Sequence, residues 1–311
     1  LISRQALAEF AHTAKPAVCG LCGNHCKLNI NTFPGGRKSI SGNRCERPLG
    51  SKQQNLPDLV KYKYETLTGF KSKPGKRGKI GLPLGLNMYE NLPFWHAFFT
   101  ELGFEVVLSP KSSRELYISG QYSIPSDTVC YPAKLLHGHM EQLLNQGVPV
   151  IFYPCMPYNF DEGISDNHYN CPVVAYYPEL LEANVARLKE IRYLTPYFEL
   201  SRRRDFIKRA ADYFGKEFGI TKNEIAAAAE KGYAAYEAYK KSVVEEGQKA
   251  LAYAKENGRI AIVLSGRPYH IDPEINHGIN QLLTSLGLVV VTEDAVAPLM
   301  KGERVKVLNQ W

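Results

Sequence analysis

The sequence predicts an α/β protein with two parallel-sheet lobes that are joined by long helices and preceded by a small cysteine-rich metal module. Three observations predict this fold class. Short apolar runs alternate with amphipathic stretches of about a dozen residues, the pattern of strands and crossover helices in a parallel sheet. A long helical pattern interrupts this alternation at 201–257, after which it resumes. Four of the seven cysteines lie between positions 19 and 45.

The N-terminal module spans residues 1–60 and carries Cys19, Cys22, Cys26 and Cys45. Two and three residues separate the first three cysteines, so successive thiolates can turn toward one ion while the fourth completes a tetrahedral shell. Zinc and an iron–sulfur cluster both accept four thiolates, and the spacing leaves the two open. Unliganded buried thiols or disulfides are the alternatives. A short helix is expected around residues 3–12.

Residues 61–78 are basic and rich in Gly and Pro, which predicts a linker. The first α/β lobe follows at 79–200. Its apolar runs predict strands, and its amphipathic stretches, several of them ended by Gly, predict helices. In chain order these are a strand at 79–83, a helix at 92–103, a strand at 104–109, helices at 113–120 and 132–147, and strands at 148–153 and 173–177.

The segment 201–257 is expected to be almost wholly helical, packed on or between the lobes. A second lobe begins at 258, with a strand at 259–265, a helix at 275–287 and a strand at 288–292. The chain begins at Leu1 rather than Met and stops at Trp311, shortly after a core strand. We therefore expect 258–311 to be the truncated start of a lobe, and the chain to be a piece of a longer polypeptide.

Composition narrows the class of function. A net charge of +7 with basic runs at 61–79 and 202–209 suits a solvated surface or an anionic ligand such as a coenzyme A phosphate. No nucleic-acid motif accompanies the charge, and no apolar stretch is long enough for a membrane span, so neither partner is expected. Sparse, clustered thiols predict a reducing, cytoplasmic location. Neither of the common glycine-rich phosphate motifs occurs, so we expect no ATPase activity from this chain alone.

Three further cysteines, Cys130, Cys155 and Cys171, lie in loops of the first lobe. Cys130 precedes a predicted helix, where free N–H groups and the helix dipole stabilise a thiolate. Cys155 directly follows an apolar strand, at the edge where parallel sheets bind ligands. The three thiols either meet around an iron–sulfur cluster or serve as small buried side chains.

Other polar residues carry weaker hypotheses. Arg267, His270 and Asp272 follow a strand and open a helix, which suits an anionic or thioester ligand, and Asp272 serves equally well as a helix N-cap. His137 and His139 face different sides of their predicted helix. A surface or capping role is expected for them rather than metal ligation.

Five strings point to a known family: LCGNHCKLNI at 21–30, SGNRCERPLG at 41–50, NMYENLPFW at 87–95, CYPAKLLHGH at 130–139 and GRPYHIDP at 266–273. The chain resembles, over nearly its whole length, the DUF2229 region of the activase-related proteins of the 2-hydroxyglutaryl-CoA dehydratase and benzoyl-CoA reductase superfamily. In such proteins this region follows ATPase domains that couple ATP hydrolysis to low-potential electron transfer from a 4Fe-4S cluster. Those domains would be its partners in the parent polypeptide.

The resemblance implies a dehydratase-subunit fold, in which cysteines from separate loops hold a cluster near an acyl-CoA or another small reducible substrate. Cys130 and Cys155 match two such ligand positions. Ala295 stands where related sequences often have a nearby Cys, so the third ligand is either Cys171 or a residue beyond Trp311. The implied function is an iron–sulfur component of ATP-driven electron transfer to acyl-CoA dehydratases or reductases. The alternative is a zinc-stabilised structural or docking module without redox activity.

Overall fold

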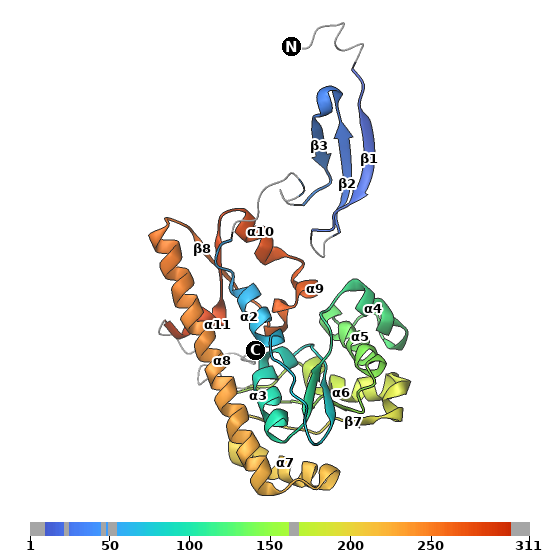
Figure 1. Cartoon of the computed structure of the whole chain (residues 1–311), viewed down its shortest axis with the longest axis vertical. Helices are drawn as coiled ribbons and strands as arrows, with labels where there is room; N and C mark the ends of the chain where they lie inside the picture. Colours follow the sequence, from blue (N-terminus) through green and yellow to red (C-terminus); the bar gives the residue numbers. More distant parts are fainter. Residues whose placement is uncertain (1–9, 22–24, 45–47, 49–54, 162–167, 300–311) are drawn as a thin grey trace.

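The computed structural model describes residues 10–21, 25–44, 48, 55–161 and 168–299 (Figure 1). Within them the chain forms a small antiparallel sheet and two parallel sheets, with helices between and around the parallel sheets. The parallel sheets confirm the predicted α/β class. Among the described residues, no helix combines the length and the apolar character that a membrane crossing requires.

The N-terminal sheet lies at one end of the molecule (Figure 1). Its strands β1 (Thr13–Val18), β2 (Lys27–Thr32) and β3 (Lys38–Ser41) form an antiparallel meander in the order β1-β2-β3, and a short turn, η1 (Pro34–Gly36), joins β2 to β3. Most of the helix expected at 3–12 lies outside the described residues. Residues 10–12 are not helical, and a strand begins immediately after them.

The first lobe is a four-stranded parallel sheet in the order β5-β4-β6-β7. Its strands are β4 (Lys79–Leu82), β5 (Glu105–Leu108), β6 (Val150–Phe152) and β7 (Arg192–Leu194). The crossover segments contain α3 (Met88–Glu101), α4 (Arg114–Gly120), η3 (Gln121–Ser123), α5 (Tyr131–Asn145), α6 (Pro172–Asn184) and η4 (Ala186–Glu190).

Two expectations for this part of the chain were wrong. The apolar run 173–177 lies in the first two turns of α6, and the fourth strand is β7. Pro172 occupies the first helical position, and a short apolar run does not by itself distinguish a strand from a buried helix. The basic stretch expected to be a linker begins as α2 (Leu59–Thr68), capped by the Asp58 carboxylate, which accepts a hydrogen bond from the Lys61 N–H at 3.1 Å. Only 69–78 is irregular.

The region 201–257 is helical, as expected. It forms α7 (Arg203–Phe218), which ends at the left-handed Gly219, and α8 (Lys222–Glu256), which starts with a capping box between Thr221 and Glu224. Helix α8 packs against α3 and α7, and farther along its length against β9 and α11 of the second lobe. Figure 1 shows this long helix running along both lobes.

The second lobe contains the parallel strands β8 (Ala261–Leu264) and β9 (Val289–Thr292). Its helical segments are η5 (Pro268–Ile271), α9 (Pro273–Asn276), α10 (Ile279–Ser285), α11 (Glu293–Val296) and η6 (Ala297–Leu299). The single helix expected at 275–287 is broken, because His277 and Gly278 both take a left-handed conformation. The residues before α2 extend β9, since Val290 N–H donates to the Pro57 carbonyl at 3.0 Å.

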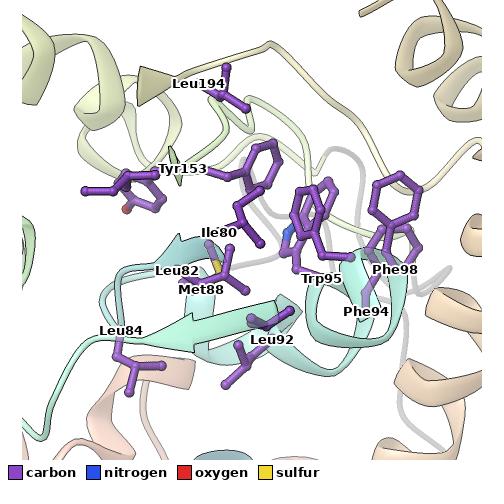
Figure 2. Close-up of a cluster of buried hydrophobic side chains, with 14 of the residues drawn as sticks. Ile80, Leu82, Leu84, Met88, Leu92, Phe94, Trp95, Phe98, Tyr153 and Leu194 are labelled. Atoms are coloured by element: carbon purple, nitrogen blue, oxygen red, sulfur yellow. The ribbon is translucent and has the colours of Figure 1, made fainter. Parts of the chain in front are cut away.

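The core of the first lobe is formed by β4, β6 and α3, which bury a dense set of aromatic rings (Figure 2). Trp95 and Phe94 are fully buried, with ring centroids 4.9 Å apart and the rings perpendicular. Tyr153 lies on the side of this cluster away from Phe94 and Phe98 (Figure 2). The core therefore fixes the end of β6 rigidly, and β6 leads directly into the candidate site.

Candidate functional site

The carboxyl edge of the first sheet contains a topological switch point. The chain visits β5 on one side of β4 and then returns to form β6 on the other. In open parallel sheets, the connections diverge at such a point and leave a ligand-binding crevice beyond the carboxyl ends of the strands. Helix α5 leads into β6 and α6 follows it, so both helices begin at this edge. We call it the thiol edge, defined by Cys130, Cys155 and Cys171.

The three cysteines approach the thiol edge from three different elements. Cys130 is the exposed N-cap of α5, and Cys171 is the half-buried N-cap of α6. Cys155 follows β6 and is completely buried. All three are free thiols. The two helix starts place N–H groups and the positive end of a dipole beside Cys130 and Cys171.

The backbone of Cys155 is held by hydrogen bonds that continue the β6–β7 pairing beyond the ends of these two strands. Its N–H donates to the Pro196 carbonyl at 2.9 Å, and its carbonyl accepts from the Phe198 N–H at 3.0 Å. Burial raises the pKa of the Cys155 thiol to about 12, and the Glu179 carboxylate adds to the increase. Without a cationic ligand this side chain is therefore a neutral thiol at neutral pH.

Tyr153 is the most unusual polar residue at the thiol edge. It is fully buried, and no described residue offers its hydroxyl a hydrogen-bond partner. Burial raises the pKa of Tyr153 well above its ordinary value, and the nearby Cys155, Tyr177 and Cys130 add to the shift. The N–H groups of Tyr153 and Cys155 both donate to the neighbouring strand, so the two side chains share a face of the sheet. A buried hydroxyl left unpaired costs stability, which makes this atom a candidate donor to a ligand.

His137 lies behind the thiol edge and was expected to have a surface or capping role. It is fully buried instead, because the chain packs α6 and η3 over this face of α5. Ser123 donates its hydroxyl proton to the Gly120 carbonyl at 2.9 Å, so it accepts from His137 Nδ1 at 2.8 Å. His137 Nε2 then accepts from the Tyr177 hydroxyl at 3.0 Å. Burial lowers the pKa of His137 to about 4, and the ring is neutral at neutral pH.

His139 was likewise expected to have a surface or capping role, and this expectation was wrong because the loop after β5 covers its face of α5. It points away from His137, as its position on the helix required, and is fully buried. Ser109 accepts from the Leu84 N–H at 2.8 Å and donates to His139 Nδ1 at 2.8 Å. His139 Nε2 donates to Ser112 at 3.0 Å. Burial lowers the pKa of His139 to about 3.

Asp272 joins the two lobes. Its Oδ2 accepts hydrogen bonds from the hydroxyls of Tyr89 and Ser112, which belong to the first lobe. Its Oδ1 accepts from the N–H groups of Glu274 and Ile275, at 2.8 and 3.3 Å. Asp272 is thus the N-cap of α9, and it is fully buried. Burial raises the pKa of this carboxyl, although its four donors act in the opposite direction.

Arg267 and His270 lie together at the carboxyl edge of the second sheet. Both line a cavity of about 230 Å³, which Asp272 does not line. Burial raises the pKa of the intervening Tyr269, and the nearby Cys130 and Cys171 of the thiol edge add to the increase. The segment 266–272 therefore separates two distinct environments, and the three residues predicted to bind one ligand are divided between them.

Of the N-terminal cysteines, Cys19 and Cys26 are described and lie side by side. The Cys19 N–H donates to the Cys26 carbonyl at 2.9 Å at the open end of the β1–β2 pair, and both side chains are buried against Leu28. Cys22 and Cys45 lie outside the described residues. Across the described parts of the chain, no group of three or more His, Cys, Asp or Glu side chains is already gathered as a metal site.

Sequence reasoning missed Tyr153, Lys63 and Glu293. Tyr153 precedes Cys155 by two positions, so strand alternation places both on one face, and this was the available signal. Lys63 and Glu293 carried no local signal, since 230 residues separate them and only the fold brings both to one cavity.

The fold and this edge define an α/β protein with open parallel sheets and with thiols at the switch point of the first sheet. Among protein families, the model described as "CoA enzyme activase uncharacterised domain (DUF2229)" matches residues 79–296, from β4 to α11. The chain belongs to this family, as the resemblance implied. No curated protein and no solved structure matches the chain.

Proposed function

We propose that this chain is the iron–sulfur component of an ATP-driven electron-transfer system that acts with acyl-CoA dehydratases or reductases. Membership in the CoA enzyme activase family supports an activase-related role. The redox assignment rests on the thiol edge. Three free cysteines lie there, at the starts of two helices and after the end of one strand, all at one switch point.

The residues of the thiol edge fit a 4Fe-4S cluster in the kind of ligand that they offer. Thiolates are the ligands that such clusters require, and Cys130 and Cys155 would supply two of them. Cys171, or a residue beyond Trp311, would supply another. The unpaired Tyr153 hydroxyl provides a hydrogen-bond donor of the kind that tunes cluster sulfur. When bound, the cluster would supply one-electron transfer at low potential.

The protein side chains would each have a physical task at this edge. Full burial of Cys155 keeps water from one side of the site, whereas the exposed Cys130 leaves the other side open to a partner. ATP hydrolysis is assigned to ATPase domains of the parent polypeptide. The reducible ligand would be an acyl-CoA or a related small molecule.

The second candidate function is a structural or docking module held by zinc. It is favoured by the pair Cys19 and Cys26, which are joined through the backbone at a hairpin end and buried together. Two thiols in such a turn, with Cys22 between them in sequence, are typical of a zinc knuckle. In this case the thiol edge would hold no metal, and the family role would be partner recognition.

Metal analysis of anaerobically purified full-length protein separates the two functions. The redox function requires iron and acid-labile sulfide, with a brown absorbance that Cys130→Ser and Cys155→Ser remove. Cys26→Ser is the matched control in the module and should leave the iron of the thiol edge in place. Colourless protein that contains only zinc, lost in Cys26→Ser, would instead establish the structural module.

A further inference from the structure

The cavity at the carboxyl edge of the second sheet is partly open, and it is separate from the thiol edge. We call it the β8–β9 cavity. Its volume is about 230 Å³, and its walls come from the ends of β8 and β9, the segment after β8, and α2. The carboxyl ends of parallel strands are the usual ligand position in this class of fold. Its polar lining residues are Lys63, Ser265, Arg267, His270, Asn276, Thr292 and Glu293.

Lys63 is a buried cation in the wall of this cavity. Its side chain is only 8% exposed, and its ammonium donates to Asp294 Oδ2 at 2.6 Å. The described part of the chain gives Nζ this one hydrogen-bond partner. An ammonium has three donors, and leaving donors of a buried charge unused is costly. The geometry therefore provides for a further acceptor inside the cavity.

The loop after β8 is shaped to bring its donors close to the same space. A Cβ on Gly266 would lie 2.4 Å from His270 Nδ1, so only glycine lets the imidazole lie against the backbone there. His270 Nδ1 accepts from the Arg267 N–H at 3.0 Å. Burial and Arg267 lower the pKa of His270, so the ring is neutral and carries its proton on Nε2. Arg267 and His270 thus both contribute donors to the lining.

Glu293 adds an acceptor to an otherwise donor-rich wall. It is half-buried, and burial raises the pKa of its carboxyl, although Lys63 and the Gly266 N–H lower it. A fully ionised anion without protons would meet this oxygen with repulsion. An anion that retains an O–H group would donate to it and would accept from Lys63 and Arg267 at the same time.

We propose that the β8–β9 cavity binds a protonated oxoanion, either inorganic phosphate or the terminal group of a phosphate monoester. Lys63 and Arg267 provide the cationic donors, and Glu293 accepts from the remaining P–OH. The cavity selects phosphate over sulfate, because sulfate carries no proton at neutral pH and would leave Glu293 facing a second negative charge. This site is independent of any metal at the thiol edge.

Calorimetric titration of the full chain at pH 7 with sodium phosphate, glycerol 3-phosphate and sodium sulfate tests the proposal. Phosphate or the monoester should bind at least about tenfold more tightly than sulfate, since one lost charge-assisted hydrogen bond is worth at least that factor. If only the monoester binds, the site serves an esterified ligand. If both bind, the free anion is sufficient.

Lys63→Gln and Arg267→Gln should each weaken phosphate binding by about tenfold or more. Lys61→Gln is the matched control, because Lys61 is on the same helix but its side chain is 58% exposed and does not line the cavity. If Lys63→Gln unfolds the chain, Arg267→Gln still tests the proposal. Binding of neither phosphate compound, equal binding of sulfate, or equal weakening by Lys61→Gln would each overturn the proposal.

Discussion

Both parallel sheets present a carboxyl edge, but the two edges differ in chemistry. The thiol edge combines cysteines with phenols, including the unpaired Tyr153, and its deepest thiol is neutral because burial raises its pKa. The β8–β9 cavity instead combines the buried cation Lys63 with Arg267 and a carboxyl group. Under the two proposals above, the same position in the fold would hold a thiolate-bound cluster in one lobe and an oxoanion in the other. The fold provides the position, and a few side chains decide the ligand.

The largest expected effect concerns thiol reactivity within the thiol edge. In metal-free native protein at pH 7.5, Cys130 should react with iodoacetamide on the order of a thousandfold faster than Cys155. Cys130 is exposed, whereas Cys155 is buried with its pKa raised to about 12, and only thiolate reacts. Mass spectrometry of timed samples gives both rates. Urea-unfolded protein is the control, in which Cys130 and Cys155 should react at similar rates. Similar reaction rates of the two thiols in the native state would refute the burial assigned to Cys155.

The second effect tests the residue that joins the two regions. Asp272→Ala should lower the free energy of unfolding by about 4 kcal/mol, because Tyr89 and Ser112 would be left as buried donors without an acceptor. Urea unfolding measures the loss. Ser113→Ala, which removes the partly buried N-cap of α4, should cost only about 1 kcal/mol. Equal losses in the two variants would contradict a special role for Asp272.

Acid pH should lower the stability mainly of the first lobe. The pKa of His137 is about 4 and that of His139 about 3 in the folded chain, both below the value of about 6.5 in unfolded peptides. The unfolded chain therefore takes up protons first as pH falls. The stability that these neutral rings contribute is present above about pH 6.5 and is lost as pH falls toward their folded values.

At pH 5 each of these two histidines should account for about 2 kcal/mol of lost stability relative to pH 7. We expect His137→Gln and His139→Gln each to reduce the difference between unfolding free energies at the two pH values by that amount. His12→Gln, at an exposed position, is the control. An unchanged pH dependence in both buried variants would show that these rings are protonated or solvated in the folded chain.

The smallest effects compare two tyrosines of the thiol edge. In metal-free protein, Tyr153→Phe should raise stability by about 1 kcal/mol, because it removes a buried hydroxyl without a partner. Tyr177→Phe should lower stability by about 1 kcal/mol, because His137 Nε2 loses its donor. Urea unfolding of both variants tests the opposite signs. Destabilisation by Tyr153→Phe would mean that this hydroxyl has a partner in solution.

The sequence predicted the edge better than it predicted its surroundings. Strand-then-loop order places Cys155 at a carboxyl edge, and the Pro two positions after Cys130 predicts a helix start that the structure confirms. The run after Cys171 was nevertheless taken for a strand, because valines and tyrosines are common in strands and the run is too short to show a period. Local sequence patterns thus predict where a helix or strand begins or ends more reliably than they predict whether a short apolar run is a helix or a strand.

The remaining features depend on contacts that are distant in sequence. His137 and His139 are buried because η3 and the loop after β5 pack over α5. No local sequence pattern predicts this packing. Lys63 pairs with Asp294 across 231 positions, and Asp272 contacts Tyr89 across 183. A charged residue in a basic stretch is normally solvated, so burial of Lys63 could be seen only after folding.

The central claim is that the thiol edge, rather than the N-terminal module, holds the redox cluster. The most direct measurement is electron paramagnetic resonance of dithionite-reduced, anaerobically purified protein in which Cys19, Cys22, Cys26 and Cys45 are all replaced by Ser. The account predicts that the signal of a reduced 4Fe-4S cluster persists in this variant and is lost in Cys130→Ser/Cys155→Ser. A signal that disappears with the four N-terminal cysteines and survives in the double variant would contradict it.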